Sequence, residues 1–246
     1  MRCGRTKRNL PSRIYMELAV ASTVNVPTPD GILHAYLAEA RIQPAPSVVV
    51  IQEAFGVNRD VRATCDELAL QGFNAISPDL YWRQEPDLQL SAESDWARGI
   101  ALYQALNLDK AVEDVRATVE LARQAKSSTG SVGVMGFCLG GLLTYLTAVR
   151  GGVDAGVCFY GGRTDEFLGE AASLRGPLLM HMGSKDEFLS PQAQESIQRA
   201  LEPLGVEIHI YPGRSHAFAR HKGQHYDAEA ATRAMARTVA FLRAHL

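Results

Sequence analysis

The sequence predicts a single α/β domain with a mostly parallel sheet of about eight strands and helices on both of its faces. Short apolar runs alternate with segments of helical periodicity from residue 47 to the C-terminus. This alternation is typical of a parallel sheet that helices cover on both faces. The 246 residues suit one such domain, and no repeat, low-complexity linker or composition break divides the chain after residue 16.

The N-terminal part of the domain predicts an antiparallel hairpin, because Val20–Val26 and Leu33–Ala38 flank the turn-forming segment Pro27–Gly31. The strands that follow are short apolar runs, as expected for strands that are buried on both faces. These predicted strands are Ser47–Ile51, Asn74–Ser77, Ser131–Met135, Val153–Phe159, Pro177–Met182 and Val206–Tyr211.

The segments between these strands have the periodicity of helices. The first helix closes at Gly72, since glycine commonly follows the last turn of a helix. The segment Ser91–Ala125 is long enough for one or two helices, with a break near Asn107–Asp109. The other predicted helices are Val61–Gln71, Leu139–Val149, Pro191–Leu201 and Glu229–Ala244.

Composition and charge are ordinary for a soluble globular protein, with 46% hydrophobic and 21% charged residues. The net charge is −2, so nothing in the overall charge directs the chain to nucleic acid or to anionic membranes, and we expect neither partner. We expect a monomer or weak dimer. Residues 1–16, which contain several basic side chains and no acidic one, lack the apolar run of a secretory signal. They predict a flexible tail before the domain, which spans residues 17–246.

The cysteines are scattered along the chain, at Cys3, Cys65, Cys138 and Cys158. None forms a CxxC pair, which argues against a zinc site. A domain of this size needs no disulfides, and reduced thiols predict a cytoplasmic location. The nearby histidines His216, His221 and His225 match no zinc-binding spacing, so we expect no metal.

A candidate nucleophile, Cys138, lies in the segment Gly136–Gly140, which has the sequence GFCLG and follows a predicted strand directly before a predicted helix. The glycines permit a sharp turn, and the helix N-terminus favours thiolate over thiol. This context predicts the nucleophile elbow of the α/β-hydrolase fold, with cysteine in place of the usual serine. The alternative is a buried cysteine in a glycine-rich turn.

The chain order of this fold, nucleophile then acid then histidine, selects Asp186 and His216 as partners of Cys138. Each of the two follows a predicted strand, at the sheet edge where open α/β sheets place their sites. His216 would exchange a proton with the thiol, and Asp186 would orient the imidazole. The alternative for Asp186 is a solvated loop acid or a helix N-cap, and His181 is expected to pack in the core.

Glu53 ends the apolar strand Ser47–Ile51, where a charge is costly unless it is paired. In this fold the neighbouring backbone supplies the oxyanion hole, here through the N–H groups of Ala54 and Leu139. The alternative for Glu53 is a surface acid at a strand end.

Taken together, these motifs resemble the dienelactone hydrolase family, whose members open 4-carboxymethylenebutenolide. The resemblance extends from about Val26 to Leu242. It is carried by QEAFGVNRD (52–60), SPDLYWRQ (77–84), GVMGFCLGG (133–141), FYGG (159–162), HMGSKDEF (181–188) and SHAFAR (215–220).

The resemblance implies that Cys138 is the nucleophile, His216 the base and Asp186 its orienting acid. It also implies that Glu53 contacts the resting thiol and helps to activate it when substrate arrives. The expected reaction is the opening of small carboxylate-bearing lactones through a thioester acyl-enzyme, without a cofactor.

The resemblance further implies that Arg83 and Arg220 bind the substrate carboxylate, which suits a guanidinium fork. Tyr160 would line the pocket. Two positions depart from the family pattern. Ala217 stands where serine is usual, which removes one polar substrate contact, and Trp82 stands where a small residue is common, so we expect Trp82 to contact the substrate and to narrow or reshape the pocket.

Two other functions remain open. One is a carboxylesterase of the same fold that acts on other small esters or lactones. The other is a binding protein that has kept the fold without the chemistry, although the presence of Cys138, Asp186 and His216 argues against it.

Overall fold

The computed structural model of the protein describes residues 20–91, 94–221 and 223–246, so the predicted tail at residues 1–16 lies outside the described residues. The described residues form eight strands. They are β1 (Val20–Thr28), β2 (Gly31–Glu39), β3 (Ala45–Ile51), β4 (Asn74–Pro78), β5 (Ser128–Phe137), β6 (Ala155–Phe159), β7 (Leu178–Gly183) and β8 (Glu207–Tyr211).

All eight strands belong to one sheet, in the order β1-β2-β4-β3-β5-β6-β7-β8. The predicted hairpin is confirmed, because β1 pairs antiparallel with β2, and β2 pairs antiparallel with β4. The remaining neighbours pair in parallel, from β4 across to β8. The carboxyl ends of β3 to β8 therefore lie along the same edge of the sheet.

The helices connect these strands as the sequence predicts. They are α1 (Arg59–Leu70), α2 (Trp96–Ala105), α3 (Leu108–Gln124), α4 (Leu139–Arg150), α5 (Pro191–Leu201) and α6 (Ala228–His245), with the 3-10 segments η1 (Thr164–Ser173) and η2 (Glu202–Leu204). The break predicted near Asn107 separates α2 from α3, and the Asn107 side chain caps α3 by accepting the Lys110 N–H at 3.0 Å. The sequence analysis did not predict η1.

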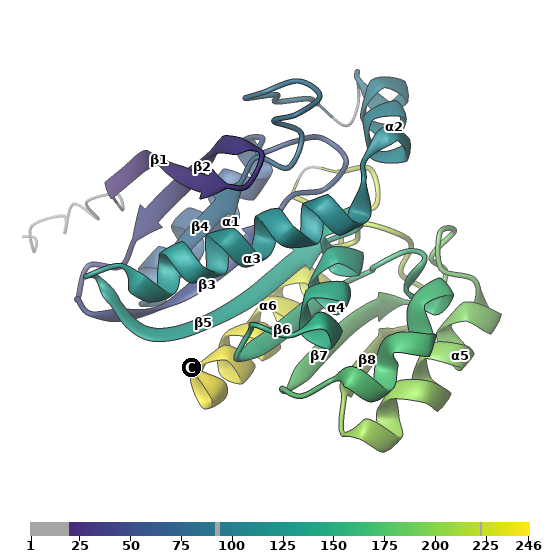
Figure 1. Cartoon of the computed structure of the whole chain (residues 1–246). Coiled ribbons are helices and arrows are strands. Elements are labelled where there is room, and N and C mark those ends of the chain that lie inside the picture. Colours follow the sequence, from purple (N-terminus) through teal and green to yellow (C-terminus); the bar gives the residue numbers. More distant parts are fainter. Residues whose placement is uncertain (1–19, 92–93, 222) are drawn as a thin grey trace, which may run out of the picture.

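The sheet lies between two layers of helices, with α3 and α4 in front of it and α1 and α6 behind it in Figure 1. Each layer has its own core. Leu142, Leu146 and Val115 belong to the front core, which α5 also joins, while Leu68 and Leu242 belong to the rear core. Because the central strands are covered on both faces, they are apolar without alternation.

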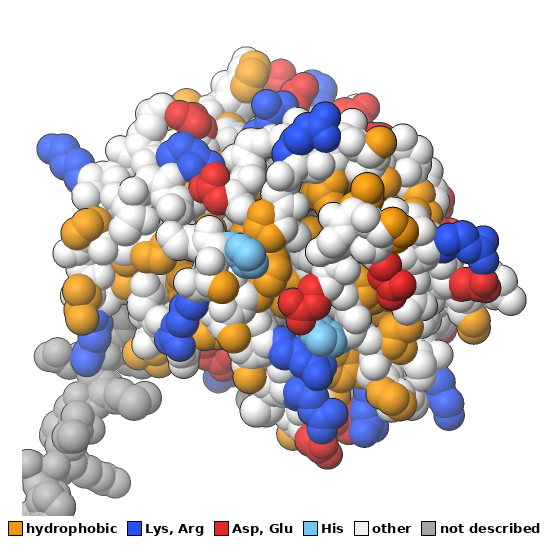
Figure 2. All heavy atoms as spheres, turned by 90° about the horizontal axis from the view of Figure 1, so that it is seen from below, with side chains coloured by type: hydrophobic (Ala, Val, Ile, Leu, Met, Phe, Trp, Pro, Cys, Tyr) orange, Lys and Arg blue, Asp and Glu red, His pale blue; other side chains and the backbone are white. Residues whose placement is uncertain are grey.

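α2 stands apart from both layers, at one end of the sheet in Figure 1. On the face shown in Figure 2, acidic and basic side chains are interspersed among apolar ones. No helix in the described part of the chain is long and apolar enough to cross a membrane.

The turn between β5 and α4 is strained, because Cys138 has a positive φ of 53° and a ψ of −113°. Its glycines permit the close approach of neighbouring backbone. A Cβ on Gly136 would lie 2.3 Å from the Gly140 carbonyl oxygen, and a Cβ on Gly140 would lie 2.5 Å from the Ile51 carbonyl oxygen. The Cys138 N–H donates to the Phe159 carbonyl at 3.0 Å, which fixes the turn to β6.

Gly136→Ala should destabilise the protein by roughly 2–3 kcal/mol or more, since the added methyl would overlap the backbone of the turn. Gly169→Ala is the matched control, because a Cβ there would meet no atom within 4 Å. Urea unfolding of the two variants checks this. Equal stability of Gly136→Ala and the wild type would show that the turn can relax.

Candidate active site

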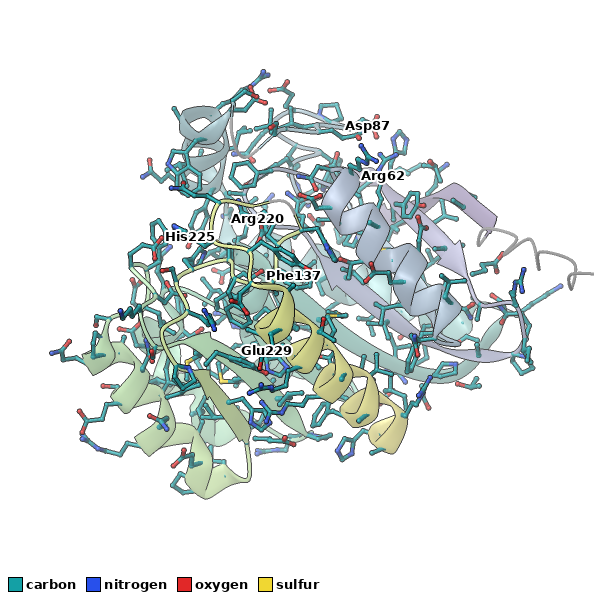
Figure 3. All side chains as sticks on the ribbon, turned by 180° about the vertical axis from the view of Figure 1, so that it is seen from behind. Arg62, Asp87, Phe137, Arg220, His225 and Glu229 are labelled. Atoms are coloured by element: carbon teal, nitrogen blue, oxygen red, sulfur yellow. The ribbon has the colours of Figure 1, made fainter. Side chains whose placement is uncertain are left out.

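The predicted catalytic residues meet at the carboxyl edge of the sheet. Cys138 follows β5, Asp186 follows β7, His216 follows β8 and Ala54 follows β3. Figure 3 shows the labelled Arg220, His225 and Phe137 near one another at this end of the molecule. The parallel pairing of the strands explains why residues so far apart in sequence lie together.

His216 and Asp186 form a buried pair. The imidazole Nδ1–H donates to the two carboxylate oxygens at 2.9 and 3.0 Å, and the Phe188 backbone N–H donates to the same carboxylate at 2.9 Å. Since a carboxylate can only accept, the proton of this bond lies on Nδ1. This arrangement leaves the Nε2 side of the ring for the nucleophile, as a triad requires.

The pKa of His216 depends on the neighbouring thiol of Cys138. Burial by itself would lower the pKa, but the charge of Cys138 and the hydrogen bond to Asp186 raise it to about 10. His216 Nε2 has no hydrogen bond of regular geometry to any described residue, so Cys138 acts on the ring mainly through its charge. The arrangement therefore favours the protonated form of the His216 ring.

A pocket of about 110 Å³ opens beside Cys138 and His216. Its other lining residues are Ala54, Phe55, Trp96, Ile100, Tyr103, Leu139, Gly162, Arg163, Phe188 and Arg220.

One wall of the pocket comes from α2, which the sequence analysis did not connect with the site. Trp96, Ile100 and Tyr103 line the pocket and are spaced by four and three residues, so they share one face of the helix. This spacing is the signal in the sequence that could have identified the pocket-lining face of α2. Phe55 and Phe188 were also missed, although each lies within a motif that carried the resemblance.

Both predicted oxyanion-hole residues line the pocket next to Cys138. Leu139 is the first residue of α4, so its N–H has no acceptor within the helix. Ala54 lies in the loop after β3. Both residues therefore lie beside the region where charge would develop on a carbonyl oxygen attacked by Cys138, and their role as an oxyanion hole stays a prediction.

Glu53 pairs with Arg220 rather than with the thiol. Arg220 Nε lies 2.6 Å from Glu53 Oε2, and both side chains are at most 10% exposed. The Arg220 guanidinium also lies over the Phe55 ring, 5.1 Å from its centroid. No contact between Glu53 and Cys138 is found among the described residues, so the predicted contact with the resting thiol stays a prediction.

Tyr160 lies behind the imidazole instead of lining the pocket. Its ring meets the His216 ring edge-on, with centroids 5.1 Å apart. Burial and the charge of Glu53 raise the pKa of Tyr160 well above its usual value, which keeps the phenol protonated. The Tyr160 hydroxyl and Glu53 Oε1 are buried and have no hydrogen-bond partner among the described residues.

The structure does not bring Arg83 and Trp82 to the pocket. Arg83 binds Asp114 through two nitrogens, at 2.5 and 3.0 Å, and Asp30 through Nε at 2.9 Å. The Trp82 indole donates to Asp114 at 3.0 Å, and the guanidinium lies 4.3 Å from the centre of its ring. The Asp114 side chain is only 1% exposed, and removing one partner of such a buried pair costs about 3–5 kcal/mol.

The remaining histidines near the site have other partners. His225 Nδ1 donates to the His216 carbonyl at 3.1 Å, and His221 lies 3.6 Å from Glu67. Within residues 20–91, 94–221 and 223–246, no three His, Cys, Asp or Glu side chains are grouped as metal ligands.

Backbone strain gathers at the pocket. Of the five non-glycine residues with positive φ in the described part of the chain, Cys138, Tyr160, Arg163 and Ala217 belong to the site or adjoin it. Strained backbone of this kind concentrates where function requires a side chain to be placed against its preference. The fifth, Asp87, lies in the loop after β4.

Replacing Cys138 by alanine should lower the pKa of His216, because the thiol charge disappears while burial remains. Since the folded pKa is raised, the charged ring stabilises the fold most below pH 6.5, and this contribution is lost as the pH rises to about 10. An NMR titration of the His216 ring in both proteins measures the shift. An unchanged pKa in Cys138→Ala would contradict the pairing.

Comparison with known proteins identifies the family. The dienelactone hydrolase family model matches residues 33–246. The "Putative carboxymethylenebutenolidase" of Azospirillum brasilense is 42% identical, covering 88% of this chain and 95% of its own length. The carboxymethylenebutenolidase of Pseudomonas putida is 38% identical, covering 81% and 86%. The solved "Putative Dienelactone Hydrolase" of Klebsiella pneumoniae superposes with a TM-score of 0.80 at 27% identity, covering 91% and 98%. The chain therefore belongs to the dienelactone hydrolase family and is a carboxylic ester hydrolase.

Proposed function

We propose that the protein opens small carboxylate-bearing lactones of the dienelactone type through a triad of Cys138, His216 and Asp186 and a thioester acyl-enzyme. The observation that carries the proposal is the buried His216–Asp186 pair beside the strained turn that holds Cys138 in the pocket. The names of the relatives, carboxymethylenebutenolidases, support the same substrate class.

The reaction begins when the Cys138 thiolate attacks the lactone carbonyl carbon and forms a C–S bond. The N–H groups of Ala54 and Leu139 stabilise the resulting oxyanion. When the carbonyl re-forms, the ring C–O bond breaks and releases an enolate, which takes the proton of the His216 imidazolium and leaves that ring neutral. Because an enolate is a better leaving group than an alkoxide or an amine, a thiolate suffices as nucleophile.

The second half of the reaction clears the thioester. His216 takes a proton from water, which attacks the thioester carbonyl, and the Cys138 thiolate leaves. Asp186 keeps the imidazole in the required orientation and stabilises its charged form during both proton transfers. No step requires a cofactor or a metal ion.

A second candidate is a carboxylesterase that acts on small neutral esters. The aromatic and aliphatic lining of the pocket, from Phe55, Trp96, Ile100 and Phe188, favours an apolar acyl or leaving group. The two functions share the triad and differ in their dependence on a substrate carboxylate.

We also propose a cytoplasmic location, because reduced, unpaired thiols are typical of cytosolic proteins. The described cysteines, Cys65, Cys138 and Cys158, are all free thiols.

Hydrolysis of cis- and trans-dienelactone beside p-nitrophenyl acetate distinguishes the two functions. We expect a higher kcat/KM for at least one dienelactone, because only the dienelactones carry a carboxylate for the protein to bind. A preference for the neutral ester would favour the carboxylesterase. If neither substrate were cleaved, both proposals would fail.

Cys138→Ser should lose roughly 100-fold or more in kcat/KM, since the site favours a thiolate and serine needs a stronger base. Cys138→Ala should be inactive. Cys65→Ala is the matched control, because Cys65 is buried in α1 away from the pocket. Steady-state kinetics on all three variants check this, and turnover by Cys138→Ala would rule out a cysteine nucleophile.

A further inference from the structure

We propose that Arg163 is the specificity-determining residue that binds the substrate carboxylate at the pocket rim, in the role that the family resemblance assigned to Arg83 together with Arg220. The inference rests on the lactone hydrolysis proposed above. Three arginines, Arg83, Arg163 and Arg220, differ in their position and in the burial of their counter-ions.

Arg163 and Arg83 differ in their position relative to the pocket. Arg163 follows β6 and precedes η1, and it lines the same pocket as Cys138 and His216. Arg83 is not among the described residues that line this pocket. A substrate whose carbonyl meets Cys138 therefore has Arg163 within the same pocket wall.

Arg163 also differs from Arg83 and Arg220 in the exposure of its carboxylate partner. Asp114, which holds Arg83, is 1% exposed, and Glu53, which holds Arg220, is 8% exposed. Glu166, which holds Arg163, is 50% exposed, with Nε and Nη2 of the guanidinium 2.8 to 3.1 Å from its oxygens.

The exposure of a counter-ion decides how easily an arginine changes its partner. A buried carboxylate that loses its arginine is left uncompensated, which is costly. A carboxylate at the surface is resolvated by water, and an exposed pair contributes little to begin with. Of these three arginines, Arg163 can therefore bind a substrate carboxylate at the least cost.

Local structure holds Arg163 in place for this role. Its backbone is left-handed, with a φ of 68°, which is unusual for arginine. The next residue, Thr164, is fully buried and donates to the Gly161 carbonyl at 2.8 Å, which anchors the turn. Tyr103, from the α2 wall of the same pocket, lies beside the guanidinium and interacts with it electrostatically.

The chemistry of the guanidinium suits this position. It has five N–H donors in a planar fork, so it can share a substrate carboxylate with Tyr103 or exchange Glu166 for it. The geometry thus points to a lactone whose ring carbonyl faces Cys138 and whose carboxylate faces Arg163 at the open side of the pocket. A neutral ester of the same size would gain nothing from Arg163.

The test compares two variants on a matched pair of substrates, the dienelactone and its carboxamide, which keeps the ring and removes the charge. Arg163→Asn removes the cation with a residue that tolerates a left-handed backbone, and Arg163→Lys keeps the charge without the fork. Arg199→Gln, an exposed arginine on α5 paired with Glu195, controls for the loss of one positive charge. Arg83→Gln tests the alternative ligand.

We expect Arg163→Asn to raise the KM for the dienelactone at least about tenfold, with a smaller change in kcat and little change for the carboxamide. Arg163→Lys should recover part of the loss, and Arg199→Gln should resemble the wild type. Equal effects of Arg163→Asn on both substrates, or none, would overturn the inference. So would a carboxylate-specific effect of Arg83→Gln alone, which would leave the lactone hydrolysis intact.

Failure of the proposed function is recognised separately. If the wild type cleaves neither the dienelactone nor its carboxamide, the lactone hydrolysis itself is wrong, and the role of Arg163 falls with it. If the wild type cleaves both with equal kcat/KM, lactone hydrolysis stands, but no residue selects the carboxylate, and the inference is overturned.

Discussion

The candidate active site of this protein depends on one backbone constraint, the sharp turn that joins β5 to α4. The chain makes this turn only because Gly136 and Gly140 have no Cβ. A Cβ at these two positions would lie 2.3 and 2.5 Å from backbone carbonyl oxygens. The turn forces Cys138 to a positive φ and places it at the N-terminus of α4, at the sheet edge where β7 and β8 deliver Asp186 and His216. The position of β5 between β3 and β6 in the sheet holds the chain in this strained turn.

Most of the fold was predictable because its signals are local. Apolar runs without alternation identified the central strands, Gly72 ended a helix and Asn107 began one. That Cys138, Asp186 and His216 lie at one edge of the sheet was also predictable, since their order along the chain and the strand before each of them determine where they meet. Here sequence and structure agree because parallel strands bring their carboxyl ends to one edge.

The pocket lining was harder to predict, because side-chain partners depend on tertiary contacts between segments that are distant in sequence. Arg83 lies within a family motif, but Asp30 and Asp114, from the β1–β2 turn and from α3, hold it outside the pocket. Arg163 has no motif of its own and reaches the pocket through a left-handed turn after β6. Counter-ion burial is a property of the fold that no spacing of residues reveals.

The central claim is that the sulfur of Cys138 carries the acyl group during turnover. The most direct test is mass spectrometry of the enzyme after rapid acid quenching in the presence of dienelactone, followed by peptide mapping. The account predicts a thioester adduct with the mass of the opened lactone on the peptide that contains Cys138. Turnover with the adduct on another residue, or with no adduct even when a slowly hydrolysed substrate is used, would contradict it.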